Sequence, residues 1–157
     1  VHGGLADMGA FKLEDSSMQN IKLWAEKNRS KLMSLLDQNP SYVFFREMPA
    51  RATTGDPAMD GPVGALGVPL TPGRSIAVDP RHIPLGAPVY LATTMPNSEV
   101  PLARLMFAQD TGGAIRGPVR ADFFWGFGAD AGALAGKMRQ QGRMWVLLPR
   151  GYSMPKP

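Results

Sequence analysis

Three aspartates in the second half of the chain have surroundings that suit chemistry. Asp79 stands in Ala-Val-Asp-Pro, Asp110 in Gln-Asp-Thr-Gly-Gly and Asp122 in Arg-Ala-Asp-Phe-Phe. Each ends or follows an apolar run and is soon followed by Gly or Pro, a pattern typical of strands that bring acidic side chains to one edge. The sequence therefore predicts an active site built on carboxylates.

Asp122 has the local setting of a proton donor. A carboxyl group works as a general acid near neutral pH when burial or a neighbouring carboxylate keeps it protonated. The aromatic residues at 123–125 would give Asp122 apolar walls that disfavour its ionised form. Asp110 would supply a like charge or a hydrogen bond that holds Asp122. The alternative is that these aspartates only cap turns, and for Asp79, which precedes a proline, that structural role is favoured.

Other chemistries find less support. His2 and His82 stand at no ligand spacing from another candidate, which disfavours zinc, and the alternating acidic loop of the familiar calcium motif is missing. No Gly-x-Ser-x-Gly is present for a serine nucleophile. The pair Gly112-Gly113 does not match a phosphate-binding loop, but it would let backbone amides approach a ligand closely. We therefore predict no metal.

The composition fits one domain with a sizeable core. The chain has 157 residues, of which 44% are hydrophobic and 19% charged, and it has no cysteine for a disulfide or a thiolate metal site. The net charge is +4, but Lys and Arg are scattered and no RNA-binding aromatic motif surrounds them, so we expect no nucleic-acid partner. No apolar run approaches the roughly 18 residues of a membrane span.

The start of the chain does not look like a signal peptide. It lacks an apolar core, carries an acid, and begins with Val in place of Met. We expect that an N-terminal part of the protein lies outside this sequence.

Hydrophobic periodicity and turn residues predict the elements. A helical pattern covers 16–38, with a cap at Ser16 or Ser17 and a second stretch from Ser30. A loop or linker is predicted at 50–62. A late helix is predicted at 129–140. Short strands are predicted at 42–47, 63–68, 75–78, 89–94, 101–109 and 143–148.

Short strands with few helices, and no regular alternation of strand and helix, predict a mainly β fold with helical decoration. A small β-barrel fits this pattern best, and a doubly wound nucleotide-binding fold is disfavoured.

Three segments resemble the three-aspartate domain of the membrane-bound lytic murein transglycosylase A family, namely 74–86, 109–117 and 120–124. The stretches 16–21 and 39–45 are similar to the family segment that precedes this domain. The resemblance implies a double-psi β-barrel with a second domain inserted into it, present only in part because the early barrel strands and most of the inserted domain have no counterpart. Residues 1–48 would link from the inserted domain, and 49–157 would form the catalytic barrel domain.

The resemblance also implies an activity. Members cleave the β-1,4 bond between N-acetylmuramic acid and N-acetylglucosamine without water, leaving a 1,6-anhydro end. Carried onto this sequence, Asp122 is the acid and then the base, Asp110 is its supporting carboxylate, and Asp79 is structural. The sugar's own 6-hydroxyl attacks, so one carboxyl can serve twice. The residues expected to contact the substrate are Gln109, Thr111, Gly112, Gly113 and Trp125.

The implied setting is the periplasmic side of the bacterial outer membrane. The partners would be peptidoglycan glycan strands and the remaining part of the same protein, with a lipid anchor outside this chain, no cofactor and a monomeric state. A different class of function stays open, a non-catalytic module that holds cell-wall glycan by stacking on Trp125, Phe124 and Tyr90. A stand-alone structural fragment is a third interpretation.

Overall fold

The computed structural model describes residues 18–38, 56 and 60–152. The chain divides into two compact units, Val1–Ala50 and Arg51–Pro157, and each is described by itself. The predicted assignment of 1–48 to an inserted domain and 49–157 to a catalytic barrel stays a prediction. No helix in the described part of the chain is both long and apolar enough to cross a membrane.

The described residues of the first unit form two helices, α2 (Met18–Lys27) and α3 (Arg29–Leu36). The predicted helical stretch is interrupted at Asn28, whose side-chain amide donates a 2.9 Å hydrogen bond to the carbonyl of Trp24. Asparagine competes for backbone groups in this way, which explains why the helix ends there. Leu35 is fully buried. The predicted caps at 16 and 17 and the predicted strand at 42–47 lie outside the described residues.

The second unit is built on a five-stranded sheet with the order β4-β1-β3-β2-β5. β1 and β3 are parallel, and every other pair is antiparallel. The elements are β1 (Ser75–Val78), β2 (Pro88–Thr94), β3 (Pro101–Asp110), β4 (Ala121–Phe123), the helix α4 (Gly128–Lys137) and β5 (Arg143–Val146). The predicted mainly β architecture with few helices is confirmed.

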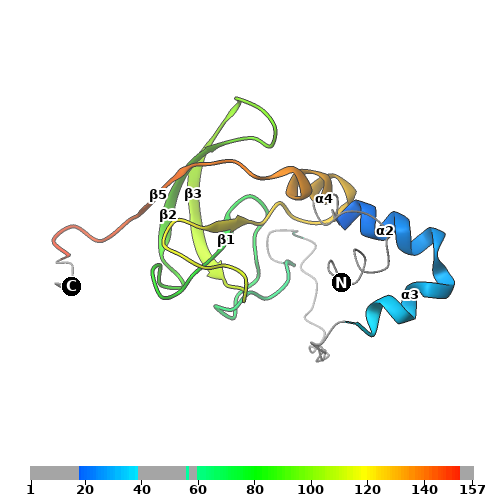
Figure 1. The fold of residues 1–157 in the computed structure, drawn as a ribbon. Helices are drawn as coiled ribbons and strands as arrows, with labels where there is room; N and C mark the ends of the chain where they lie inside the picture. Colours follow the sequence, from blue (N-terminus) through cyan, green and yellow to red (C-terminus); the bar gives the residue numbers. More distant parts are fainter. Residues whose placement is uncertain (1–17, 39–55, 57–59, 153–157) are drawn as a thin grey trace. The chain divides into compact units, whose positions relative to one another are not determined.

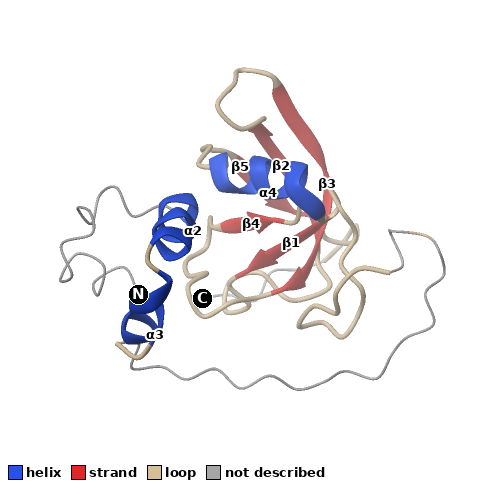
Figure 2. Cartoon of the chain, turned by 90° about the vertical axis from the view of Figure 1, so that its right-hand side faces the viewer, coloured by secondary structure: helices blue, strands red, loops and turns tan. Residues whose placement is uncertain are grey.

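The sheet is strongly curved. β2 and β3 run side by side as its longest strands (Figure 1), and the short β1 pairs with the end of β3. Figure 2 shows the same curvature from the side. Over the described residues the sheet has two edges, β4 and β5, so the barrel is open there.

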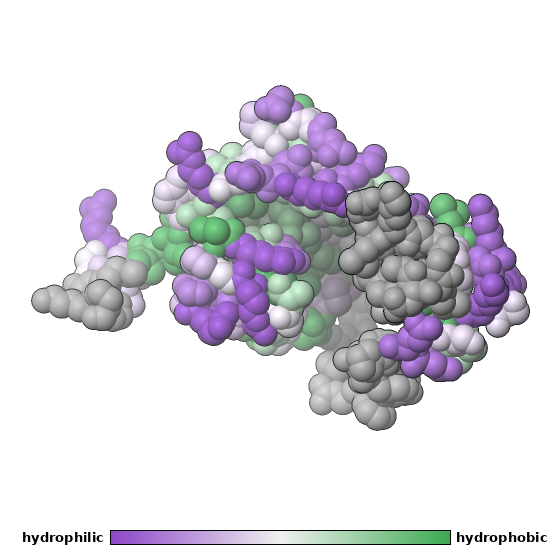
Figure 3. Space-filling model, viewed as in Figure 1, coloured by the Kyte–Doolittle hydropathy of each residue, from purple (hydrophilic) through white to green (hydrophobic). Residues whose placement is uncertain are grey.

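The core lies on the inner face of this curve. Side chains alternate along β3, where Met106 and Ala108 are fully buried and Leu105 and Phe107 are exposed, as the pleat of a strand requires. Apolar side chains therefore also reach the surface of this unit between hydrophilic ones (Figure 3). The buried cluster consists of Ile76, Val78, Ile83, Val89, Leu91, Met106 and Ala108.

The predicted strand at 63–68 is wrong. Only an isolated bridge between Val63 and Pro69 forms there, and the chain turns back on itself between them. Gly67 has a φ of 82°, a conformation that glycine adopts without strain, and the amide of Gly64 donates to the carbonyl of Val68. The apolar run belongs to a turn that folds against the end of β3, not to the sheet.

Three further elements differ from expectation, and one of them is β5, which ends at Val146, two residues before the end of the predicted strand at 143–148. β4 is not among the predicted strands, although its three residues carry Asp122. α4 begins one residue early and ends at Lys137, three residues short of the predicted end, because Met138 is already extended with a ψ of 109°. Asp130 lies in its first turn, as predicted.

Candidate active site

β1 brings two of the predicted aspartates to one place. Ala77 pairs with Asp110 of β3 on one side and with Asp122 of β4 on the other. Adjacent strands lie about 4.8 Å apart, so the two aspartate Cα atoms are about 10 Å apart. Both aspartates line one pocket of about 250 Å³, and only the small side chain of Ala77 stands between them in the sheet.

Asp122 is held by an arginine. The side chains of Asp122 and Arg120 are each half exposed, and Arg120 donates from Nε to Oδ1 at 3.1 Å and from Nη2 to Oδ2 at 3.4 Å. Residues two apart along an extended chain point the same way, which brings the two side chains together. Arg120 was not among the predicted site residues, although its spacing from Asp122 was a usable signal.

The expected aromatic wall stands beside Asp122. The rings of Phe123 and Trp125 are in contact, with centroids 4.5 Å apart, and both residues line a pocket of about 260 Å³ together with Asp122. The indole Nε1 of Trp125 is buried and has no hydrogen-bond partner among the described residues. Asp122 therefore has an apolar neighbourhood on one side, while half of its side chain stays open to solvent.

Asp110 is held by the turn between Val63 and Pro69, which stands where a strand was predicted. The amide of Ala65 donates to Oδ1 of Asp110 at 2.9 Å, and the amide of Leu66 donates to the carbonyl of Gln109 at 3.0 Å. In the described part of the chain, the side-chain hydrogen bonds of Asp110 and Asp122 go to these separate partners and not to each other.

The other residues predicted to contact the substrate differ in their surroundings. One is hydrogen-bonded within the fold, whereas another has open space beside its backbone. The side-chain oxygen of Gln109 accepts a short hydrogen bond from the buried hydroxyl of Ser75, so it braces the end of β3. A side chain at Gly112 would come within 3.2 Å of Ile115, whereas one at Gly113 would meet no atom within 4 Å. Thr111 is half-buried. Gly113 therefore offers the most open backbone beside Asp110.

Asp79 lies apart from this pocket and is fully buried. Arg81 donates to its carboxylate from Nη2 at 2.6 Å and from Nε at 3.0 Å, and the backbone amide of Gly117 donates at 2.9 Å. The hydrogen bonds from Arg81, followed by that from Gly117, hold the pKa of Asp79 well below its usual range, although burial opposes them. Asp79 therefore ties the turn after β1 to the segment that leads into β4.

This geometry predicts an acid-dependent loss of stability. Because the folded-state pKa of Asp79 is depressed, its contribution is complete above the usual carboxyl pKa of about 3.9 and is lost as the pH falls further. We expect the free energy of unfolding to decline less steeply between about pH 5 and 2.5 in Asp79→Asn than in the wild type. Denaturant titrations across this pH range measure the free energy of unfolding. Asp130→Asn is the control at an exposed aspartate. An equal decline in both variants would contradict the assignment.

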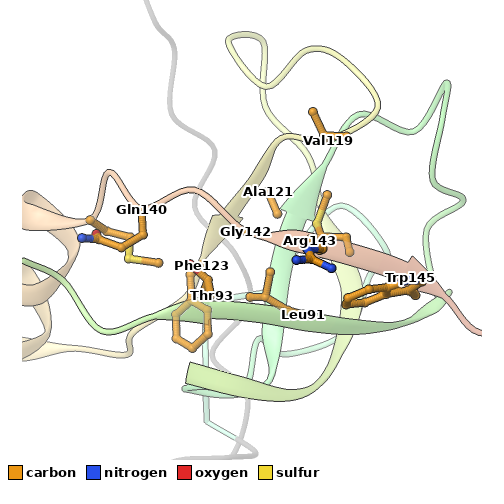
Figure 4. Close-up of a pocket in the computed structure, with 11 residues that line it drawn as sticks. Leu91, Thr93, Val119, Ala121, Phe123, Gln140, Gly142, Arg143 and Trp145 are labelled. Carbon is orange, nitrogen blue, oxygen red and sulfur yellow. The ribbon is translucent and has the colours of Figure 1, made fainter. Parts of the chain in front are cut away.

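A larger pocket of about 380 Å³ lies beside the candidate site, between the two edges of the sheet. Figure 4 shows that β2, β4 and β5 all contribute to it. Ala121 and Phe123, the neighbours of Asp122 in β4, line this pocket together with Met144 of β5. The edge strand that carries Asp122 thus contributes residues both to this pocket and to the aspartate pocket.

Two family models and several known proteins match this chain. The family model of the 3D domain matches residues 74–148, and that of the MltA specific insert domain matches residues 2–46. The chain is 39% identical to membrane-bound lytic murein transglycosylase A of Escherichia coli K12, over 91% of this chain and 38% of that protein. Its identity to the Vibrio cholerae protein of the same name is 33%, again over 38% of that protein. The chain thus spans just over a third of these relatives.

Solved structures resemble the chain over nearly all of its length. MltA from Neisseria gonorrhoeae is 48% identical with a TM-score of 0.81, over 98% of this chain and 38% of that one. The lytic transglycosylase LtgG of Burkholderia pseudomallei is 57% identical with a TM-score of 0.61, over 96% and 43%. Escherichia coli MltA with bound chitohexaose is 35% identical with a TM-score of 0.70, over 92% and 42%. Together with the sheet, these matches confirm the predicted partial double-psi β-barrel.

Proposed function

Because the chain belongs to the membrane-bound lytic murein transglycosylase A family, we propose that its protein is a peptidoglycan lytic transglycosylase, a carbon–oxygen lyase. The observation that carries the proposal is the placing of Asp110 and Asp122 on the two sides of Ala77 at one pocket. The bound chitohexaose of the Escherichia coli relative supports a glycan as the ligand.

The proposed reaction uses Asp122 twice. Its proton passes to the glycosidic oxygen of the leaving N-acetylglucosamine as the bond to the anomeric carbon of N-acetylmuramic acid breaks. The 6-hydroxyl of the same muramic acid then bonds to that carbon and gives its proton to the Asp122 carboxylate. The product is a 1,6-anhydro ring, no water is consumed, and Asp122 is protonated again for the next cycle.

Asp110 has the supporting role. Positive charge builds at the anomeric carbon as the glycosidic bond breaks, and a fixed carboxylate nearby stabilises that charge. The hydrogen bond from Ala65 fixes the Asp110 carboxylate at the pocket. This division needs no metal or organic cofactor.

The remaining predicted residues would contribute to substrate binding in different ways, most of them by direct contact and one indirectly. Gly113 has open space where a side chain would stand, which lets a glycan approach the backbone. Trp125 lines the pocket beside Asp122, and Thr111 and Gly112 follow Asp110 directly. Gln109 acts indirectly, since its side chain holds Ser75.

The proposed location is the periplasmic side of the outer membrane, with a lipid as the anchor and a monomer as the working form. The support is that relatives carry the name membrane-bound and that peptidoglycan is the proposed substrate.

A glycan-binding module without catalysis is the alternative. One observation favours it, because Tyr90 is exposed on the outer face of the sheet beside Trp145, with ring centroids 6.0 Å apart. Neighbouring exposed aromatic side chains offer flat apolar faces to a sugar ring.

The test is digestion of purified peptidoglycan by the full-length protein in ¹⁸O-labelled water. A lytic transglycosylase releases 1,6-anhydro products without label. Labelled reducing ends would overturn the proposal in favour of a hydrolase. Binding without any released product would favour the glycan-binding alternative.

A further inference from the structure

The chain contains two aspartate–arginine pairs with the same two-residue spacing but different surroundings. Asp79 is fully buried and receives several hydrogen bonds from Arg81 and Gly117, so this pair is fixed. Arg120 and Asp122 are each half exposed, and one of their contacts is long, at 3.4 Å. An exposed ion pair of this kind is weak and is readily exchanged for another partner.

This second pair conflicts with the proposed work of Asp122. Arg120 donates to both carboxyl oxygens of Asp122, the atoms that the proposed reaction uses to give a proton to the leaving oxygen and to take one from the 6-hydroxyl. The conflict disappears if Arg120 leaves Asp122 when the substrate binds. Something with a negative charge has to attract the guanidinium at that moment.

A pocket next to the pair has the charge for such a ligand. It encloses about 600 Å³ and is lined by Arg120 and Arg139 together with Asp122. Gln140 and Gln141 add amide groups to the same lining. Two arginines against one aspartate fit an anionic, hydroxyl-rich ligand, and guanidinium groups recognise carboxylates with parallel hydrogen bonds.

We propose that Arg120 is a specificity-determining residue that exchanges the carboxylate of Asp122 for a carboxylate of the glycan. The inference rests on the proposed function. N-acetylmuramic acid carries a lactyl carboxylate that N-acetylglucosamine lacks, and peptide stems carry carboxylates of their own. Binding of either group releases Asp122 from its ion pair, so the site becomes competent only when an acidic sugar strand is in place. Arg139 adds a second cation to the same pocket.

The experiment compares three forms of one substrate. Glycan strands stripped of peptide by an amidase have free lactyl carboxylates, the same strands coupled to methylamine are neutral there, and unstripped strands carry carboxylates on their stems. The full-length protein is measured as wild type, Arg120→Gln and Arg120→Lys, with Arg150→Gln as the control at an exposed arginine remote in sequence from the pocket lining. The readout is kcat/KM for anhydro-product release on each form.

Wild type and Arg150→Gln are expected to prefer a carboxylate-bearing form over the neutral one. Arg120→Gln should lower this preference by about tenfold, because a hydrogen-bonded charge pair with the substrate is lost. Arg120→Lys should keep part of it. A preference for the stripped strands identifies the recognised group as the lactyl carboxylate. A preference for the unstripped strands identifies it as a carboxylate of the peptide stem.

Equal losses on all three forms in Arg120→Gln would show a merely structural role and overturn the inference, as would an unchanged preference. Activity of the wild type in either case would leave the proposed function standing. A wild type that releases no anhydro product from any form would overturn the proposed function itself.

Discussion

The Asp122→Asn variant is expected to release anhydro products at least about 10²-fold more slowly than the wild type, the usual minimum for losing a general acid–base group. The loss should be larger, because in the proposed reaction one carboxyl serves as the acid and then as the base. An amide can neither give a proton to the leaving oxygen nor accept one from the 6-hydroxyl. The measurement is the initial rate of 1,6-anhydro product formation from purified peptidoglycan.

The fold should survive this substitution. Asp122 is half exposed, and its described side-chain partner is the equally exposed Arg120, so the melting temperature should stay close to that of the wild type. Asp130→Asn makes the same chemical change at an exposed aspartate in the first turn of α4 and should keep wild-type activity. A variant at Asp122 that is as active as Asp130→Asn would remove Asp122 from the mechanism.

Gly64→Ala is expected to damage the site from a distance. The added Cβ would lie 2.5 Å from the carbonyl oxygen of Gln109 and 3.3 Å from the Cβ of Asp110, so the turn has to move away from β3. Overpacking of this kind costs about 1–3 kcal/mol of stability. The move also breaks the hydrogen bond from Ala65 to Asp110. Since displacement of a catalytic group by about 1 Å can cost 10²-fold, we expect kcat/KM to fall by up to about that factor.

The matched control is Gly132→Ala, where an added Cβ meets no atom within 4 Å. Gly132 lies inside α4, where alanine is favoured over glycine by about 1 kcal/mol, so this variant should be as stable as the wild type or more so. Thermal unfolding and peptidoglycan digestion measure both variants. If Gly64→Ala unfolds at the wild-type temperature and digests at the wild-type rate, the turn does not hold Asp110.

Periodicity was sufficient for the long central strands. Buried and exposed side chains alternate in β2 from Val89 to Leu91 and at both ends of the run from Pro101 to Ala108 in β3. The predicted bounds of 89–94 and 101–109 agree with the structure to within one residue at each end. Local pattern is informative there because the sheet has two unlike faces.

Hydrophobic periodicity did not predict the short elements correctly. β4 has three residues, too few for an alternating pattern, and its place in the sheet is decided by pairing with β1. The run at 63–68 was misread because apolar residues between prolines resemble a strand, whereas Gly64 and Gly67 shape it into a turn. The conformation of the run at 63–68 also depends on tertiary contacts with β3, which cannot be predicted from local sequence.

The assignment of the aspartates to an active site stays a prediction, and the contacts that hold them were not predicted. The separation of Asp79 from the other two aspartates follows from local chemistry, since an aspartate before proline favours a turn. The importance of Arg120 and of the turn at Ala65 was missed. Arg120 stands two residues from Asp122, a spacing that brings opposite charges together on a strand, while Ala65 is 45 residues from Asp110 in sequence and is brought to it only by the fold.

The parallel pairing of β1 with β3 has a consequence for how the chain folds. β2 and β3 are neighbouring segments that form an antiparallel hairpin, whereas the chain between β1 and β3 is longer and contains β2. Contacts between distant segments pay a larger loop-closure entropy and form later. The two aspartates that flank β1 are therefore assembled last, and pulse-labelling hydrogen exchange should protect β2 before β1. Asp110 and Asp122 would then come together at their pocket only after the hairpin of β2 and β3 has formed.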